Sequence, residues 1–265
     1  MASKDDERAA RARLSKSRRV IVKIGSKSLS GDAWERMAAE VGELVNAGRK
    51  VVIVSSGAIA LGTQRLGLRA RPKDMAWLQA AAAVGQSALM QRWEAALAPV
   101  GLTGAQVLLT HADLADRTRT NNAQRALEAL LEAGAIPIIN ENDAVSVEEI
   151  KFGDNDQLAS MVVPLVGADL LVLLSDVEGL LDDHGVRVSF VRSIAREARG
   201  LAGGSRSGVG TGGMTSKVEA AHRATIAGAD VVIAHARTPG ILPRVLAGDD
   251  EGTLFPATLQ RISAR

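Results

Sequence analysis

Short apolar runs alternate with amphipathic stretches along most of this 265-residue chain. Runs rich in Val, Ile and Leu predict strands, and apolar residues at helical spacing predict helices. The predicted strands are residues 19–24, 50–54, 105–109, 135–139, 169–174 and 230–234. The predicted helices are residues 33–47 with Asp32 as N-cap, 75–97 as one helix or two, 121–131, a helix from about 155, 215–226 and 241–246.

Strands that are apolar on both faces and alternate with helices favour a mainly parallel sheet covered by helices on both sides. No internal repeat and no long linker interrupts this pattern, so the chain is expected to form an α/β domain from residue 19 to residue 265. Residues 177–194 are typical of short strands and turns, and they could form a small second lobe.

The first 18 residues are basic but contain no apolar core, which excludes a secretory signal. Acidic residues at positions 5–7 speak against an organelle transit peptide. We expect this N-terminal extension to be a frayed, solvated helix outside the domain.

Composition excludes several classes of protein. The chain has no cysteine, which rules out disulfides, thiolate metal sites and cysteine nucleophiles, and it fits a reducing compartment such as the cytoplasm. A net charge of +2 with evenly mixed signs gives no reason to expect a nucleic-acid partner. No apolar run approaches the roughly 18 to 20 residues that cross a bilayer, so no membrane partner is expected. The four histidines are scattered outside every motif and are expected to be structural or surface residues: His111, His184, His222 and His235.

Two polar clusters stand out, Asn-Glu-Asn-Asp at residues 140–143 and Asp-Asn-Asp at residues 154–156. The first follows a buried strand, and in parallel sheets binding sites form beyond the carboxyl ends of strands. The second lies where a helix should begin, so helix capping is an alternative explanation for it. Two such clusters in one short stretch indicate a polar site.

Three glycine turns add candidate phosphate contacts. Lys23 precedes the Gly25-Ser26 turn, and Ser56 precedes Gly57 at the end of the next strand. A glycine-rich stretch at residues 208–217 leads into a helix that carries Lys217. Backbone N–H groups at such turns bind anions, although each turn alone could be an ordinary surface turn or a flexible loop. The stretch 208–217 has neither the residue order of a Walker A loop nor the strand before it that a dinucleotide-binding motif needs.

Together these features favour phosphoryl transfer. Two lysines on separate glycine turns can neutralise the charge on a transferring phosphoryl group. The acidic and amide cluster can hold the acceptor and help to organise Mg²⁺ on the nucleotide phosphates. A carboxylate acceptor is already anionic and needs no strong base, which agrees with the absence of a well-placed histidine.

The chain resembles the glutamate 5-kinase family, a branch of the amino-acid kinases. The matching blocks follow the family order from residue 20 to residue 257, and the pair Asn-Glu-Asn-Asp (140–143) and Gly-Asp-Asn-Asp (153–156) sets this branch apart from acetylglutamate, aspartate and uridylate kinases. The blocks are residues 22–26, 54–59, 83–87, 137–145, 150–156, 174–176, 210–217 and 252–255.

The resemblance implies a three-layer α/β/α sandwich with about eight strands. It also implies ATP-dependent phosphorylation of the γ-carboxylate of L-glutamate in the cytoplasm, which is the first step of proline biosynthesis. The implied catalytic residues are Lys23, Lys217 and Asp156, and the implied glutamate-binding residues are Ser56, Asp143 and Asn155. The implied ATP-binding residues are Gly25, Ser26, Gly57, Ser175, Asp176, Thr211, Gly212, Gly213, Met214, Thr215, Ser216 and Lys217. Mg²⁺ would be held mainly through the nucleotide phosphates rather than by protein ligands.

By resemblance, the part before about residue 170 binds glutamate and the part after it binds ATP. Proline would act as a feedback inhibitor through residues 69–86, and the protein would be a homodimer or homotetramer. Three features depart from the family. The chain stops at Arg265, too soon for the C-terminal PUA domain of many relatives; Lys27 replaces a small hydroxyl residue; and residues 28–50 and 180–208 are short segments.

Two other functions stay open at this point. A different kinase of the same fold would phosphorylate acetylglutamate, aspartate or a nucleoside monophosphate instead of glutamate. A sensor or scaffold would bind glutamate or proline without turning over ATP.

Overall fold

One continuous sheet forms the centre of the molecule. The computed structural model describes residues 4–146, 155–198 and 211–258, so residues 150–154 and 210 of the family blocks, including Asp154 of the second polar cluster, lie outside these ranges. Within the described ranges the sheet has seven strands in the order β3-β4-β2-β1-β5-β6-β7, against the approximate eight expected. The strands are β1 (Arg19–Ile24), β2 (Lys50–Ser55), β3 (Gly104–Leu109), β4 (Ile136–Glu141), β5 (Leu170–Ser175), β6 (Asp230–His235) and β7 (Thr253–Phe255).

All neighbouring strands are parallel except β7, which pairs antiparallel with β6 at the sheet edge. The six strands predicted from the sequence are therefore present, and only the three-residue β7 was not anticipated. Because these strands are parallel, the carboxyl ends of β1, β2, β4 and β5 lie at the same end of the sheet. The polar clusters are expected at that end.

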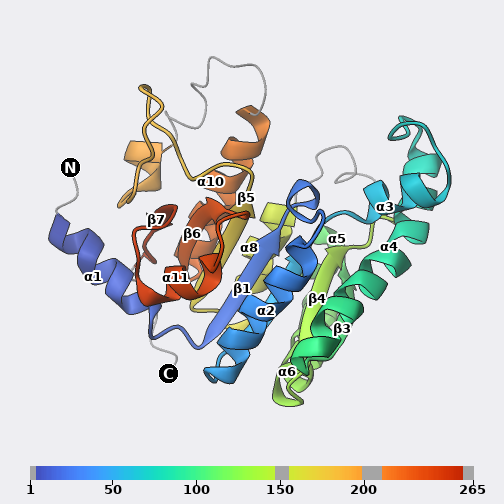
Figure 1. Cartoon of the computed structure of the whole chain (residues 1–265), viewed down its shortest axis with the longest axis horizontal. Coiled ribbons are helices and arrows are strands. Elements are labelled where there is room, and N and C mark those ends of the chain that lie inside the picture. Colours follow the sequence, from blue (N-terminus) through green and yellow to red (C-terminus); the bar gives the residue numbers. More distant parts are fainter. Residues whose placement is uncertain (1–3, 147–154, 199–210, 259–265) are drawn as a thin grey trace.

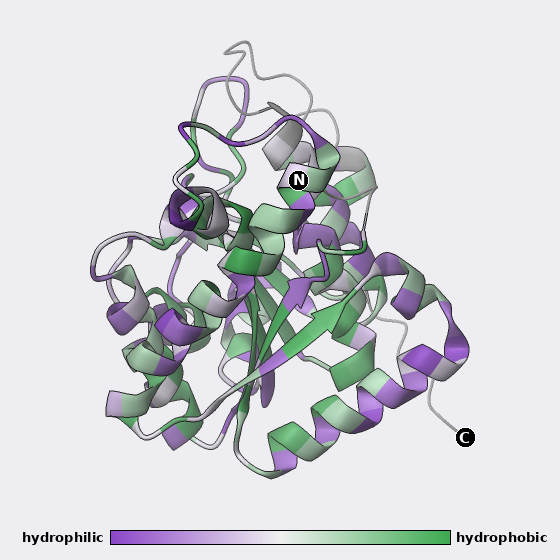
Figure 2. Cartoon of the chain, turned by 90° about the vertical axis from the view of Figure 1, so that its right-hand side faces the viewer, coloured by the Kyte–Doolittle hydropathy of each residue, from purple (hydrophilic) through white to green (hydrophobic). Residues whose placement is uncertain are grey.

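Helices cover both faces of the sheet and complete the expected three-layer α/β/α sandwich (Figure 1). Helices α1 (Lys4–Leu14), α2 (Ala33–Asn46), α4 (Met75–Leu97) and α11 (Ile241–Ala247) pack on one face. Helices α6 (Arg117–Glu132), α8 (Asn155–Val166) and α10 (Thr211–Ile226) pack on the other. Figure 2 shows the apolar strands enclosed by helices that turn polar faces outward. No helix in the described ranges is long and apolar enough to cross a membrane.

The N-terminal extension is helical, but the prediction that it is solvated is wrong. Helix α1 buries Ala10, Arg11 and Leu14, and the Leu14 side chain is fully enclosed in the core. This packing could not be predicted from the spacing of apolar residues, because one of the three buried positions of α1 is an arginine. Helix α1 is therefore an integral part of the sandwich.

The helices keep most of their predicted bounds, and the main difference is the start of α10. The Asp32 side chain makes no capping hydrogen bond to α2. Residues 75–97 form one helix, capped by Asp74. Helix α10 begins at Thr211 rather than Thr215, so the candidate ATP-binding residues from 211 to 216 lie in its first turns. Glycines 212 and 213 concealed this start because glycine is a poor helix former.

Helices α3 (Ala58–Arg65) and α4 touch through their backbones at two glycines. A Cβ atom added to Gly85 would overlap the carbonyl oxygen of Ala58, and one added to Gly62 would overlap that of Ala81. Helix α3 starts directly after the Ser56-Gly57 turn, so this close packing holds that turn against α4.

We therefore expect Gly85→Ala to destabilise the protein, because α3 has to move away from α4. Overpacking of this kind costs about 1–3 kcal/mol or more, and the midpoint of thermal unfolding should fall by about 2–4 °C per kcal/mol. Gly42→Ala in α2 is the matched control, since its Cβ would meet Val100 at an ordinary 3.4 Å. That control should raise the midpoint through helix propensity. A Gly85→Ala protein as stable as the unsubstituted chain would contradict the described packing.

Candidate active site

A buried carboxylate bridges two lysines beyond the carboxyl ends of the parallel strands. Asp156 Oδ1 lies 2.6 Å from Lys23 Nζ, and Asp156 Oδ2 accepts a 2.9 Å hydrogen bond from Lys217 Nζ. Asp156 is 3% exposed and Lys23 is 6% exposed, so water screens these charges little. The three predicted catalytic residues therefore come together from β1, α8 and α10.

The local structure explains how these side chains meet. Along β1, Ile21 belongs to the core under α8 and α10, and strand alternation puts Lys23 on that same face. Asp156 lies in the first turn of α8, where a carboxylate also interacts favourably with the helix dipole. Lys217 lies one turn and a half into α10 and packs beside α8.

The two lysines control the protonation of Asp156. Burial alone would raise the pKa of its carboxyl, but the charges and hydrogen bonds of Lys23 and Lys217 outweigh burial and hold the pKa below its usual value. Asp156 is therefore an anion at neutral pH, and both ammonium groups are held in place beside it.

A chain of amide hydrogen bonds runs next to this ion pair network. The Asn155 side chain donates to Ser56 Oγ at 2.8 Å and to Asn140 Oδ1 at 2.8 Å. Asn140 in turn donates to Gln86 Oε1 at 2.9 Å, and Gln86 donates to Gln106 Oε1 at 3.1 Å. This chain links β2, β3, β4, α4 and α8, so it fixes Ser56 and Asn155, two of the predicted glutamate-binding residues.

Asp143, the third predicted glutamate-binding residue, lines a cavity of about 320 Å³ at the end of this chain. Helix α4 and the end of β4 form most of its wall. Its lining residues are Ala58, Ala82, Ala83, Gln86, Ser87, Gln106, Leu108, Asn140, Glu141, Asn142, Asp143 and Ala144. The cavity has room for a small amino acid and offers it amides and two carboxylates.

The two carboxylates of the cavity have raised pKa values. Burial raises the pKa of Asp143 to about 6, although the charge of Arg71 opposes the rise. Burial, followed by the charges of Asp143 and Asp113, raises the pKa of Glu141 to about 8 against a hydrogen bond from Ser146. At neutral pH Asp143 is therefore mostly ionised and Glu141 mostly protonated.

The two glycine turns of the site lie against each other. Gly57 has φ of +123°, a conformation that L side chains rarely adopt, and its Cβ position would be 3.5 Å from Ser26 Cβ. Gly25 leads into the short 3₁₀ turn η1 (Ser26–Ser28), on which the Lys27 side chain is exposed. The position of Gly57 thus suits only glycine, and a Cβ atom added to Gly25 would lie 3.9 Å from Lys23 Nζ.

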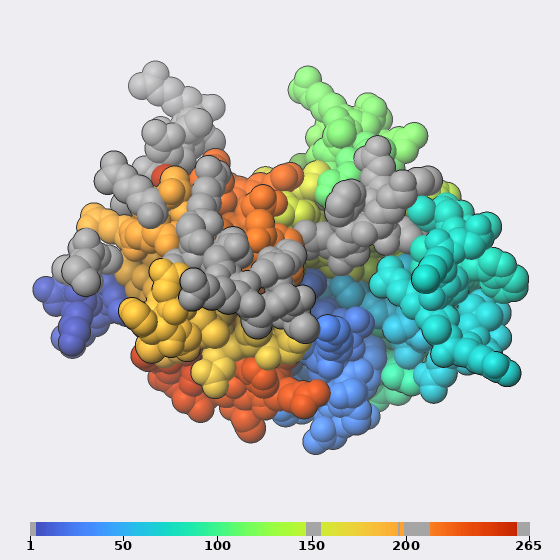
Figure 3. Space-filling view, turned by 90° about the horizontal axis from the view of Figure 1, so that it is seen from above, coloured from blue at the N-terminus to red at the C-terminus, as the bar shows by residue number. Residues whose placement is uncertain are grey.

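The predicted nucleotide-binding residues lie at the ends of β5 and α10. Ser175 ends β5 and its hydroxyl donates to the exposed Asp176 carboxylate at 3.2 Å. In α10, Met214 packs on the core and Gln157 of α8 donates to the carbonyl of Ser216 at 3.3 Å. Seen from above in Figure 3, residues 60–85 lie on one side of the molecule and the yellow and orange segments, from about residue 160 onward, on the other.

Sequence reasoning missed several residues of this site. Gln86 and Gln106 build the amide chain together with Asn140 of the predicted polar cluster, and both are polar residues inside apolar or small-residue segments, which is the signal that could have found them. His111, expected to be structural or on the surface, is partly exposed, and its Nδ1 lies 3.9 Å from Glu141 Oε2. The described residues contain no group of three or more His, Cys, Asp or Glu side chains that could hold a metal ion.

Comparisons with known proteins point to one family. Residues 18–235 match the model of the amino acid kinase family. The chain is 50% identical to the glutamate 5-kinase of Myxococcus xanthus, covering 96% of this chain and 71% of the relative. It is 44% identical to the glutamate 5-kinase of Syntrophotalea carbinolica, over 95% of this chain and 71% of that relative. It is 46% identical to the glutamate 5-kinase of Burkholderia mallei, over 96% of this chain and 72% of that relative.

Solved structures share the fold at low sequence identity. A carbamate kinase from Giardia lamblia, bound to AMP-PNP, superposes with a TM-score of 0.66 at 16% identity over 91% of this chain and 99% of that one. An N-acetylglutamate synthase from Neisseria gonorrhoeae superposes with a TM-score of 0.68 at 18% identity. The superposition covers 97% of this chain and 64% of the synthase chain.

The raised pKa of Glu141 predicts a specific pH dependence of stability. Between about pH 4.5 and pH 8 the folded protein keeps a proton on Glu141 that the unfolded chain has released, so this group lowers the free energy of unfolding as pH rises. Glu141→Gln removes the ionisable group and with it this fall in the free energy of unfolding. The difference in thermal midpoint between the variant and the unsubstituted protein should therefore grow from pH 5 to pH 8 by about 10 °C, which corresponds to about 3–4 kcal/mol.

Glu128→Gln is the control, because Arg19 lowers the pKa of the Glu128 carboxyl and leaves it ionised throughout this range. Its effect on the midpoint should stay constant from pH 5 to pH 8. A constant effect for Glu141→Gln as well would show that Glu141 is ionised in the folded protein.

Proposed function

The chain belongs to the amino acid kinase family, and we propose that it transfers the γ-phosphoryl group of ATP to the γ-carboxylate of L-glutamate, forming L-glutamyl 5-phosphate and ADP. The observation that carries this proposal is the bridge of Lys23, Asp156 and Lys217 beside an amide-lined cavity. Relatives of 44–50% identity over almost the whole chain carry the name glutamate 5-kinase, which supports glutamate as the acceptor.

The lysine pair suits the chemistry of the transfer. An oxygen of the glutamate γ-carboxylate attacks the γ-phosphorus, the bond from phosphorus to the bridging oxygen breaks, and ADP leaves with that electron pair. Charge accumulates on the phosphoryl oxygens and on ADP, and Lys23 and Lys217 are positioned to neutralise it. Asp156 touches neither reactant in this scheme and acts by orienting both ammonium groups. No general base is required, because the attacking oxygen is already an anion.

Ser56, Asn155 and Asp143 are proposed to hold glutamate. Since the Asn155 amide donates to Ser56 Oγ, the Ser56 hydroxyl proton can turn toward a substrate carboxylate. Asp143, ionised above about pH 6, can pair with the substrate ammonium group. The hydrogen bonds from Asn155 to Asn140 and from Asn140 to Gln86 hold the Asn155 side chain in this orientation.

ATP is proposed to lie on the C-terminal half. Ser175, Asp176 and residues 211–217 would contact the nucleotide, and the backbone N–H groups of Gly25, Ser26 and Gly57 would meet the transferred phosphoryl group. This assignment gives the part before about residue 170 to glutamate and the part after it to ATP. The separation of the two regions in Figure 3 supports it.

Among the described residues, no group of three or more His, Cys, Asp or Glu side chains could hold a metal ion. We propose that Mg²⁺ enters with the nucleotide phosphates, as this ion usually does in kinases. Cytoplasmic proline biosynthesis is the proposed setting. Proline is the proposed feedback ligand, because a small cyclic amino acid would fit the same cavity of about 320 Å³.

Trapping with hydroxylamine tests the function directly, because hydroxylamine converts an acyl phosphate into a coloured hydroxamate. With Mg-ATP and L-glutamate we expect hydroxamate formation that depends on both substrates. Acetylglutamate, aspartate and nucleoside monophosphates serve as alternative acceptors, and turnover with one of these but not with glutamate would reject the proposed substrate.

A proline titration in the same assay tests the feedback ligand. Proline should raise the glutamate concentration needed for half-maximal rate without lowering the plateau. Binding of glutamate or ATP without any hydroxamate would instead favour the sensor or scaffold function.

A further inference from the structure

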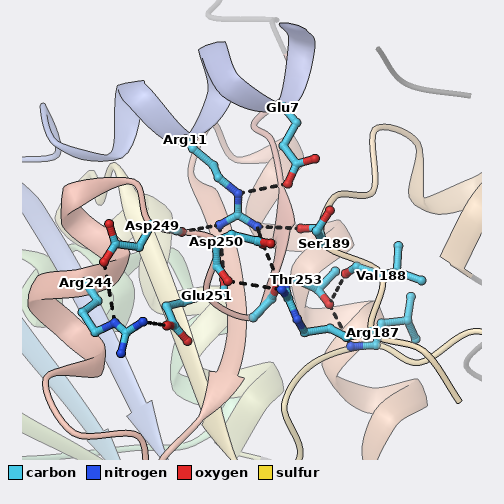
Figure 4. Close-up of polar contacts among 12 residues, drawn as sticks. Glu7, Arg11, Arg187, Val188, Ser189, Arg244, Asp249, Asp250, Glu251 and Thr253 are labelled. Atoms are coloured by element: carbon cyan, nitrogen blue, oxygen red, sulfur yellow. Dashed lines mark hydrogen bonds and ion pairs between the residues drawn. The ribbon is translucent and has the colours of Figure 1, made fainter. Parts of the chain in front are cut away.

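Arg11 of helix α1 is almost fully buried and reaches three separate parts of the chain (Figure 4). Its Nη1 donates to the carbonyl oxygens of Asp249 at 2.7 Å and Glu251 at 3.3 Å. Its Nη2 donates to the carbonyl of Ser189 at 2.9 Å and to the Asp250 carboxylate at 3.0 Å, while Nε pairs with Glu7 on its own helix at 3.0 Å. One guanidinium therefore joins α1, the loop at residues 249–252 and the segment around residue 189.

A second arginine ties the same two segments together. Arg187 donates to the carbonyl of Gly252, and its Nη2 lies 3.0 Å from the Asp250 carboxylate that Arg11 also contacts. The main chains join as well, because the amide of Leu254 donates to Ser189 at 2.9 Å and the amide of Val191 donates to Leu254 at 2.9 Å. Residues 187–191 and 249–254 thus form one junction, which we call the arginine junction, with Arg11 closing it from outside.

The arginine junction continues to the end of β5. Thr253 Oγ1 accepts a 2.8 Å hydrogen bond from the buried amide of Leu180 and donates to the carbonyl of Val188 at 2.6 Å. Leu180 is four residues beyond Asp176, so the path of the chain that leaves the candidate nucleotide-binding pair Ser175 and Asp176 is set by Thr253. Further ion pairs from α1 end in the same half, from Asp6 to Arg192 and from Arg13 to Asp230.

A plain stability role is the simplest explanation of such a cluster. Stability alone, however, does not require three chain segments that all support the residues after β5. The side chains of Arg11, Arg13 and Asp6 on α1 all reach residues of the C-terminal half: Ser189, Arg192, Asp230 and the loop at residues 249–252.

We infer that helix α1 stabilises the half of the molecule proposed to bind ATP, and that Arg11 is a positioning residue for ATP. Arg11 holds the arginine junction, the junction holds residues 180–188 through Thr253, and these residues hold the strand end that carries Ser175 and Asp176. The inference rests on the proposed function, since it takes ATP to bind at that strand end. It assigns a role in the reaction to a segment that lies outside every motif of the site.

The test separates the two substrates kinetically, at a temperature well below the unfolding midpoint of each variant. Arg11→Ala should raise the KM for ATP by about 5-fold and leave the KM for glutamate within about 2-fold, because only one half of the site loses its support. Arg8→Ala is the matched control, since Arg8 is an exposed arginine on the same helix. It should change neither constant.

A purely structural Arg11 would lower the unfolding midpoint of Arg11→Ala and leave both KM values unchanged, and that result overturns the inference. Equal rises in both KM values overturn it too, because they indicate a general loosening. If Arg11→Ala does not fold, Asp250→Asn weakens the same junction at a side chain that is 63% exposed. Its KM for ATP should then rise by about 2-fold, and an unchanged value overturns the inference.

Ligand-induced shifts of the thermal midpoint keep this test independent of the proposed reaction. A non-hydrolysable ATP analogue should stabilise Arg11→Ala less than the unsubstituted protein, whereas glutamate should stabilise both equally. If the unsubstituted protein forms no glutamyl phosphate, the proposed function fails, but the shift with the ATP analogue still decides the role of Arg11.

Discussion

The ion pairs between Asp156 and two lysines from different parts of the chain constrain the rest of this structure. Lys23 comes from the first strand and Lys217 from a helix almost 200 residues later, and their ammonium groups meet at one carboxylate. A buried carboxylate is unfavourable without compensating charge, so the anionic Asp156 requires β1, α8 and α10 to be assembled around it. In the proposed reaction the same assembly holds two cations beside the transferring phosphoryl group, which would tie the stability of the fold to its chemistry.

The amide chain extends this constraint to the other half of the site. Asn155 is the neighbour of Asp156 on α8, and through Asn140 and Gln86 it connects to β4 and α4. A shift of the first turn of α8 would therefore disturb both the lysines and the wall of the cavity. The backbone contact of α3 with α4 and the arginine junction around Arg11 hold the two outer parts of the molecule against this shared centre.

Much of the fold followed from local pattern. Six apolar runs gave the strands, because strands buried on both faces carry nearly continuous apolar sequence. The pairing of Lys23, Asp156 and Lys217 came from the resemblance to a family, since no spacing rule brings residues so distant in sequence together. Hidden from the sequence were the buried Arg11, the amides Gln86 and Gln106, and His111 beside Glu141. Each is a polar side chain whose partners lie far along the chain, and only tertiary structure identifies such partners.

The most direct test of the central claim is a double-mutant cycle on the rate of glutamyl phosphate formation, using Lys23→Met, Lys217→Met and the double variant. If Asp156 makes the two lysines act as one unit, each single substitution should lower kcat by about 100-fold or more, and the double variant should lose little beyond the worse single one. If the two losses multiply instead, the lysines act independently, and the role assigned to the Asp156 bridge is wrong.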